Sequence, residues 1–153
     1  MIDLVRTNRE NNDFKSLVTL LDLELNSRYG LIQAQYDKFN STGSINNIVV
    51  GYYDSKPVGC GCFKSYDVDT VEIKRMFVIS DLRGSGISKM ILKELELWVL
   101  ESGIQNVILE TGIKQPDAIR FYQKQGYQKV DNFGQYHSNK NSVCMAKKLI
   151  DIE

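Results

Sequence analysis

The chain has 153 residues, a length at which one domain can bury a full hydrophobic core without disulfides or bound metal. Its 19 Lys and Arg side chains balance its 19 Asp and Glu side chains, which argues against a nucleic-acid partner, because such domains carry a basic excess. Hydrophobic residues at 42% and charged residues at 25% are ordinary values for a folded protein, and no repeat or linker divides the sequence. We therefore expect a single domain over residues 1–153.

The sequence predicts neither a targeting segment nor a membrane span. The first residues contain no apolar run of signal-peptide length, and no run of about 18 apolar residues occurs anywhere. The cysteines number three, and Cys60 and Cys62 are only two residues apart, a pattern typical of a reduced chain rather than of a disulfide framework. We expect a cytoplasmic protein with no membrane partner.

Hydrophobic periodicity predicts the order of strands and helices. The expected elements are a strand at 2–7, helices at 12–28 and 31–38, strands at 48–53, 58–66 and 70–79, a helix at 86–102, a strand at 107–109, a helix at 116–125, and strands at 127–130 and 142–149. Some of these strands are joined by tight turns and others by helices, which implies a mixed sheet. The expected fold class is therefore α/β, with a mixed sheet flanked by helices on both faces.

A loop with two glycines separates the strand at 70–79 from the helix at 86–102. It reads Arg83-Gly84-Ser85-Gly86-Ile87-Ser88-Lys89. Glycine lets a ligand approach the backbone, and the N–H groups at a helix N-terminus favour an anion. The loop predicts a phosphate cradle, although the same glycines also fit a turn without a ligand. It is neither a Walker loop nor a dinucleotide fingerprint, because no Gly-Lys-Ser/Thr follows and a third glycine is absent.

This loop resembles the acetyl-CoA loop of the GNAT superfamily of N-acetyltransferases, whose pattern is Arg/Gln-x-x-Gly-x-Gly/Ala. Arg83, Gly86 and Ser88 occupy its defined positions, and Ser88 departs from the usual Gly or Ala. The element order is also that of the family, so the resemblance covers nearly the whole chain and is most specific over residues 70–127. It implies a GNAT-like fold with a central, mostly antiparallel mixed sheet, acetyl-CoA as the acyl donor, and no metal.

A second segment, from Ala118 to Tyr127, looks like the family pattern Ala-x-x-Phe/Leu-Tyr-x-x-x-Gly-Phe/Tyr. The resemblance implies that Tyr122 lies near the acetyl-CoA sulfur and acts as the general acid, because the departing thiolate needs a proton. Taken alone, the helical spacing of Tyr122 also fits a core tyrosine.

Glu72 lies on the strand that leads into the glycine loop, at a position where many GNAT members carry a general-base glutamate. A base is required because an acceptor ammonium must lose a proton before its nitrogen attacks. The sequence leaves two other interpretations of Glu72 open. Glu72 could be a strand carboxylate paired with Lys74 or Arg75, and the acceptor could lose its proton through water.

The resemblance extends the acetyl-CoA site beyond the loop. The pantetheine arm would lie beside a splayed strand at Phe77 and Val78, and Gln115 stands where many members have Asn. Lys89 and Lys124 could approach the CoA phosphates, although both positions also suit solvated lysines. The residues expected to contact acetyl-CoA are Phe77, Val78, Arg83, Gly84, Ser85, Gly86, Ile87, Ser88, Lys89, Gln115, Tyr122 and Lys124.

The expected activity is acetyl transfer to a primary amine by direct attack in a ternary complex, and the alternative is a CoA-binding regulatory module without turnover. The acceptor would be a small-molecule or peptide amine, and a homodimer is compatible with the sequence. Two segments, 26–40 and 131–141, would select the acceptor. They contain Arg28, Tyr29, Tyr36, Asp37, Tyr136 and His137, of which His137 is an alternative base.

The three cysteines and the single histidine, His137, raise the question of a zinc site or a cysteine nucleophile. The Cys60-x-Cys62 spacing is narrower than that of zinc sites, and nothing in the sequence places His137 beside a thiol. We expect Cys60, Cys62 and Cys144 to be buried structural residues.

Overall fold

The computed structural model describes residues 1–29 and 45–150, and seven strands in this part of the chain form one sheet. The strands are β1 (Ile2–Thr7), β2 (Asn47–Tyr53), β3 (Lys56–Asp67), β4 (Thr70–Val78), β5 (Asn106–Gly112), β6 (Gln128–Val130) and β7 (Ser142–Lys148), and the helices are α1 (Asn12–Tyr29), α3 (Ile87–Glu101) and α4 (Pro116–Lys124). These bounds agree with the expected elements to within a few residues. The helix expected at 31–38 lies outside the described residues.

The sheet has the strand order β1-β2-β3-β4-β5-β7-β6, in which only the β4–β5 pair is parallel. Helix α3 is the crossover between these two parallel strands, as parallel pairing requires. The expectation of a mixed, mostly antiparallel sheet is confirmed.

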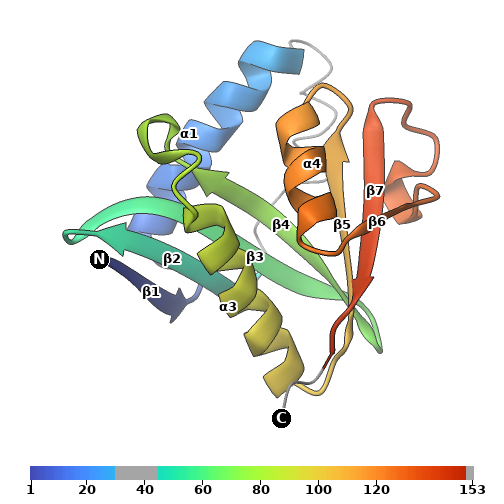
Figure 1. The fold of residues 1–153 in the computed structure, drawn as a ribbon, viewed down its shortest axis with the longest axis horizontal. Coiled ribbons are helices and arrows are strands. Elements are labelled where there is room, and N and C mark those ends of the chain that lie inside the picture. Colours follow the sequence, from blue (N-terminus) through green and yellow to red (C-terminus); the bar gives the residue numbers. More distant parts are fainter. Residues whose placement is uncertain (30–44, 151–153) are drawn as a thin grey trace.

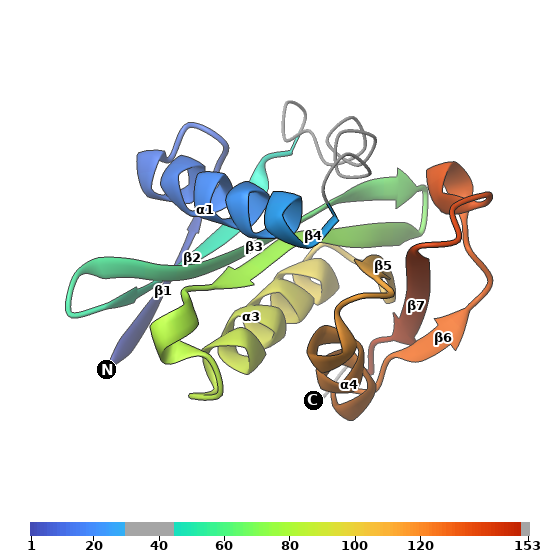
Figure 2. The same cartoon turned by 90° about the horizontal axis from the view of Figure 1, so that it is seen from above.

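The sheet lies between two helical layers, with α1 on one face and α3 and α4 on the other (Figure 2). Helix α1 begins where the Asn11 side chain accepts the backbone N–H of Phe14 at 2.8 Å, an N-cap contact. Phe14, Leu17 and Leu21 follow at helical spacing and are buried against β2 and β3. The prediction of helices on both faces is therefore confirmed.

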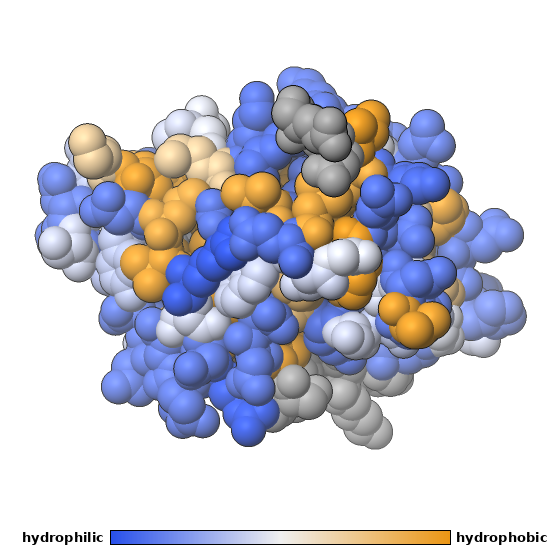
Figure 3. Space-filling model, turned by 90° about the horizontal axis from the view of Figure 1, so that it is seen from below, coloured by the Kyte–Doolittle hydropathy of each residue, from blue (hydrophilic) through white to orange (hydrophobic). Residues whose placement is uncertain are grey.

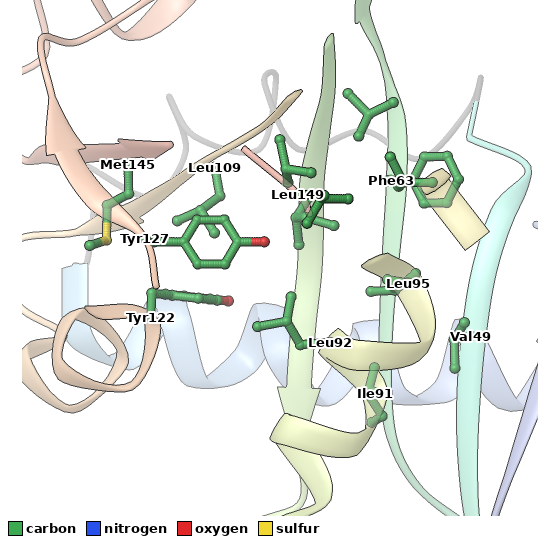
Figure 4. Packing of buried hydrophobic residues seen from close by; sticks show 14 of the residues in the cluster. Val49, Phe63, Ile91, Leu92, Leu95, Leu109, Tyr122, Tyr127, Met145 and Leu149 are labelled. Carbon is green, nitrogen blue, oxygen red and sulfur yellow. The ribbon is translucent and has the colours of Figure 1, made fainter. Parts of the chain in front are cut away.

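The larger core lies between the sheet and the layer of α3 and α4 (Figure 4). Ile91, Leu92 and Leu95 of α3 are fully buried there, because they recur on the one stripe of the helix that faces the sheet. Tyr122 of α4 and Tyr127 complete this core, and Figure 4 shows their rings lying one above the other.

Strands β4 and β5 pair over only four residues each and then separate. Their register runs from Thr70↔Asn106 to Ile73↔Leu109, although both strands continue beyond it. On its other side, β4 has a β-bulge where Arg75 adopts a left-handed backbone with φ of 58°. The result is a V-shaped opening between two central strands (Figure 1).

Two buried thiols on the neighbouring strand, β3, donate hydrogen bonds to the backbone of the bulge. The Cys62 Sγ donates to the Lys74 carbonyl at 3.1 Å, and the Cys60 Sγ donates to the Arg75 carbonyl at 3.4 Å. Burial raises the pKa of both thiols, that of Cys62 to about 12, so they remain protonated donors. The expectation that these cysteines are buried and structural is confirmed for both.

The end of the molecule away from this opening carries hydrophobic side chains between hydrophilic ones (Figure 3). A shallow depression lined by Leu100, Gly103 and Asn106 lies there, where α3 ends and β5 begins. None of the described helices is long and apolar enough to cross a membrane.

Glycines on β3 let α3 approach the sheet closely. A Cβ on Gly61 would collide with the Met76 sulfur and lie 2.9 Å from the Leu95 methyl, whereas a Cβ on Gly51 of β2 would meet its neighbours at an ordinary 3.6 Å. Replacing Gly61 therefore requires the Met76 and Leu95 side chains to move from their packed positions, whereas replacing Gly51 does not.

We expect Gly61→Ala to lower the free energy of unfolding by ~1–3 kcal/mol through overpacking. Gly51→Ala is the matched control and should change it by less than ~1 kcal/mol. Urea unfolding of the two variants beside wild type measures both values. Equal stabilities for the two variants would show that α3 does not press on β3 at Gly61.

Candidate active site

A cavity of about 110 Å³ lies where β4 and β5 separate. It reaches from α1 on one face of the sheet to α4 on the other. Its walls are Leu21 and Leu25 of α1, Ile73, Lys74, Arg75 and Met76 of β4, Leu109, Glu110 and Thr111 of β5, and Gln115, Ala118 and Tyr122 at α4. The structure thus brings two expected site residues, Gln115 and Tyr122, to one cavity.

Tyr122 stands at the α4 wall of this cavity and is held by aromatic contacts. Its ring packs edge-to-face on Phe121 and Tyr127, with centroid distances of 5.1 and 5.8 Å. Within the described residues its hydroxyl has no hydrogen-bond partner, whereas the Tyr127 hydroxyl donates to Glu96 at 2.8 Å. Burial raises the pKa of Tyr122, so the phenol stays protonated and can donate a proton.

The glycine loop opens directly into α3, as expected. Gly84 and Gly86 have φ of 82° and 91°, a backbone that L residues rarely adopt, and none of the described residues lies within 4 Å of where their Cβ atoms would stand. No side chain caps α3, and its first turn contains no acidic residue. An uncapped helix start of this kind favours an anionic group such as a pyrophosphate.

The side chain of Arg83 points back from the loop to the body of the protein. Its Nε donates to the Val78 carbonyl at 2.9 Å, and its two terminal nitrogens bind the Glu24 carboxylate of α1 at 2.6 and 2.9 Å. The guanidinium also lies 5.5 Å from the centroid of Phe77. Arg83 thus ties the loop to α1 and β4 through its side chain.

The other expected contact residues surround this loop and the cavity. Phe77 and Val78 follow the bulge on β4, where β5 no longer pairs with it. The backbone edge needed for a pantetheine arm is therefore present. Ser88 is half-buried and Ile87 is buried in the core, while Ser85 is exposed. Lys89 and Lys124 are exposed, at the start of α3 and the end of α4 respectively.

Glu72 is buried and does not line the cavity. The Tyr136 hydroxyl donates to its Oε2 at 3.0 Å, and the Lys74 Nζ lies 3.5 Å from the same oxygen. Lys74 also donates to the Tyr136 hydroxyl at 3.1 Å. The sequence left open whether Glu72 pairs with Lys74, and this pair is present in the structure. The role of Glu72 as general base stays a prediction.

Glu110 is the carboxylate at the cavity wall, and sequence reasoning missed it. The expected strand ended at Leu109, yet β5 continues and places the half-buried Glu110 side chain beside Ser142, whose hydroxyl donates to it at 2.6 Å. Burial raises the pKa of Glu110 to about 7, and Glu72 adds to this rise while Ser142 and Lys74 oppose it. A charged residue after three apolar ones in a central strand was the available signal.

The loop at 131–141 contributes Tyr136 rather than His137. Tyr136 is buried and joins Glu72 to Lys74, whereas His137 is exposed. Of the other residues expected to select the acceptor, Tyr36 and Asp37 and the side chains of Arg28 and Tyr29 lie outside the described residues.

Cys144 is buried, as expected, and all three cysteines are free thiols. Within the described residues no cluster of His, Cys, Asp or Glu could hold a metal ion.

Comparison with known proteins assigns the family. The model of the acetyltransferase (GNAT) family matches residues 14–127. The chain belongs to the GNAT family. The matched residues include the V-shaped opening, the uncapped start of α3 and Tyr122 on α4. These three features are therefore part of the GNAT domain.

Individual relatives agree with this assignment. The IAA acetyltransferase of Azospirillum brasilense is 36% identical over 96 residues, a match that spans 60% of this chain and 61% of that protein. A solved structure described as an acyl-CoA N-acyltransferase from Klebsiella pneumoniae covers 98% of the chain, and 99% of its own length, with a TM-score of 0.81 and 25% identity. A GNAT acetyltransferase from Elizabethkingia anophelis with acetyl-CoA bound has a TM-score of 0.73 at 18% identity, over 97% of this chain and 98% of that one.

Replacing Gly86 with Val should abolish binding of acetyl-CoA, because the side chain would fill the cradle and strain a backbone at φ 91°. Gly103→Val is the matched control: its φ is 83°, its Cβ also meets nothing within 4 Å, and it lies at the other end of α3. Calorimetric titration with acetyl-CoA and thermal unfolding separate the two effects. Both variants should lose similar stability, and only Gly86→Val should lose its affinity for acetyl-CoA. An unchanged affinity in Gly86→Val would show that acetyl-CoA binds elsewhere.

Proposed function

We propose that the protein transfers the acetyl group of acetyl-CoA to a primary amine by direct attack in a ternary complex. The observation that carries this proposal is the position of Tyr122, which stands at the wall of the cavity between β4 and β5, beyond the glycine loop. A module that only bound CoA would need the cradle but no proton donor beside the thioester. Membership of the GNAT family and the acetyl-CoA bound to the Elizabethkingia protein support the choice of donor.

The donor would lie along the edge of β4 that β5 leaves unpaired. The pyrophosphate would bind the N–H groups from Gly84 to Ser88, and the pantetheine would follow Phe77 and Val78 toward the cavity. Gln115 and Tyr122 would flank the thioester from the α4 side. Backbone N–H groups on the open edge of β4 would polarise its carbonyl.

The acceptor would reach the thioester from the α1 side, where Glu110 faces the cavity. We infer that Glu110 takes the proton of the incoming ammonium, because it lines the cavity and because a base with a pKa of about 7 is half ionised near neutral pH. Glu72, the base that the sequence led us to expect, would hold Lys74 and Tyr136 beside it. Once nitrogen has attacked, Tyr122 would give its proton to the departing sulfur.

Tyr122→Phe should lower kcat by ~10²–10⁴-fold and leave the affinity for acetyl-CoA nearly unchanged, because it removes only the proton donor. Tyr127→Phe is the matched control: it deletes a hydroxyl that binds Glu96 outside the cavity lining, so it should lower stability more than turnover. A single-turnover assay keeps chemistry rate-limiting. An unchanged rate for Tyr122→Phe would remove this residue from the mechanism.

The pH dependence of kcat/KM distinguishes Glu110 from Glu72 as the general base. In wild type, kcat/KM should fall as the pH drops below about 7, because Glu110 takes up a proton and can no longer accept one. The groups that face Glu110 are Lys74 and Glu72 on β4, Tyr136 in its loop, and Ser142 and Cys144 on β7. In Glu110→Gln the inflection near pH 7 should disappear, and kcat/KM should instead follow the fraction of neutral acceptor amine and rise up to the amine's own pKa.

In Glu72→Gln the inflection should persist and move to lower pH, because the charge of Glu72 raises the pKa of Glu110. An amine screen with wild type supplies the acceptor for these profiles. The reverse pattern, with the inflection lost in Glu72→Gln and kept in Glu110→Gln, would identify Glu72 as the base.

A further inference from the structure

A lysine lines the cavity in which an acceptor amine would meet the thioester. Lys74 is the one lysine among the described residues that line the cavity, at the first position of β4 beyond its pairing with β5. Its side chain lies on the face of β4 that also carries Glu72, and the two are 3.5 Å apart. Tyr122 stands at another wall of the same cavity.

The surroundings of Lys74 favour a reactive amine. The side chain is only 2% exposed, and burial lowers the pKa of its ammonium group, which raises the fraction of neutral amine. The charges of Glu72 and Glu110 oppose this effect, and Lys64 adds to it. Its contacts to Glu72 and Tyr136 hold the nitrogen in place.

We propose that Lys74 is itself an acceptor and is acetylated by acetyl-CoA bound in the same molecule. This inference rests on the proposed function, because it uses the same donor, cavity and proton donor. It adds a modification site inside the cavity.

The reaction balances with groups already present. The ammonium of Lys74 first gives a proton to Glu72, and the nitrogen lone pair then forms a bond to the thioester carbonyl carbon. The C–S bond breaks, the sulfur takes a proton from Tyr122, and the second proton lost by nitrogen restores that tyrosine. The products are an acetamide on Lys74, free CoA thiol and one proton.

Acetylation would change the site in two ways. It removes a positive charge that acts on both Glu72 and Glu110, and it adds an acetyl group at the cavity wall. The acetamide keeps one N–H, so the hydrogen bond to the Tyr136 hydroxyl can remain. The modified side chain would keep this contact, while the cavity would become smaller and more negative.

The test is to incubate the full chain with deuterated acetyl-CoA and no amine, and to follow the label by intact mass and peptide mass spectrometry. The deuterium distinguishes new acetyl groups from any acquired during expression. Lys74 should be labelled ~100-fold faster than the exposed Lys89 and Lys129, the lower end of what positioned acid–base groups contribute. Its rate should not depend on protein concentration, because the transfer is intramolecular, and Tyr122→Phe should slow it.

Lys64→Arg is the matched control, since Lys64 lies opposite Glu72 on β3 but does not line the cavity. It should keep the label, and Lys74→Arg should lose it. If Lys74→Arg does not fold, the relative labelling rates of Lys74, Lys89 and Lys129 in the wild-type protein still test the proposal. Label spread equally over exposed lysines, or absent from Lys74 in a protein that binds acetyl-CoA and acetylates an amine, would overturn this inference alone. A protein that fails to bind acetyl-CoA would overturn the proposed function with it.

Discussion

The separation of β4 from β5 after Ile73 and Leu109 is the constraint on which the rest of the site depends. Two central strands of a sheet normally satisfy each other's backbone groups, and an unpaired edge in the middle of a domain is costly. Here the bulge at Arg75 turns β4 away, and the carbonyls it disturbs are satisfied by the thiols of Cys60 and Cys62. The opposite edge of β4, which β5 leaves unpaired, is available for a ligand that can pair with it as a strand would.

The close packing of α3 on β3 fixes the second half of the site. Gly59 and Gly61 bring the helix near the sheet, so its N-terminal turn is set at a defined place relative to the opening. The glycine loop enters this turn directly from β4. A single strand thus leads from the cavity to the anion cradle, and a ligand with a pyrophosphate and a long flexible arm can contact both.

The buried ionic groups around the opening serve the site more than they serve stability. Glu72 and Lys74 are buried and Glu110 is half-buried, and taking charges out of water costs free energy that their mutual attraction seldom returns in full. Tyr136 and Ser142 provide hydrogen bonds that make this arrangement tolerable. The cluster leaves one carboxyl that titrates near neutral pH and one lysine with a lowered pKa facing a cavity, which are the properties that proton transfer from an amine requires.

The sequence by itself determined the element order, the mixed sheet, the glycine loop at residues 83–88 and the family, because periodicity, glycines and short motifs are local properties of the chain. It also indicated Tyr122 and Gln115, which the fold brings to one cavity. Only the tertiary structure decided that Arg83 turns toward Glu24, that Tyr136 rather than His137 points inward, and that Glu110 and Lys74 face the opening. The orientation of Lys74 and Glu110 depends on the bulge and on where the β4–β5 pairing stops, because a shift of one residue in either would turn both side chains to the other face of the sheet. Arg83 and Tyr136 lie outside the strands, and their directions are set by the partners that the fold brings to them.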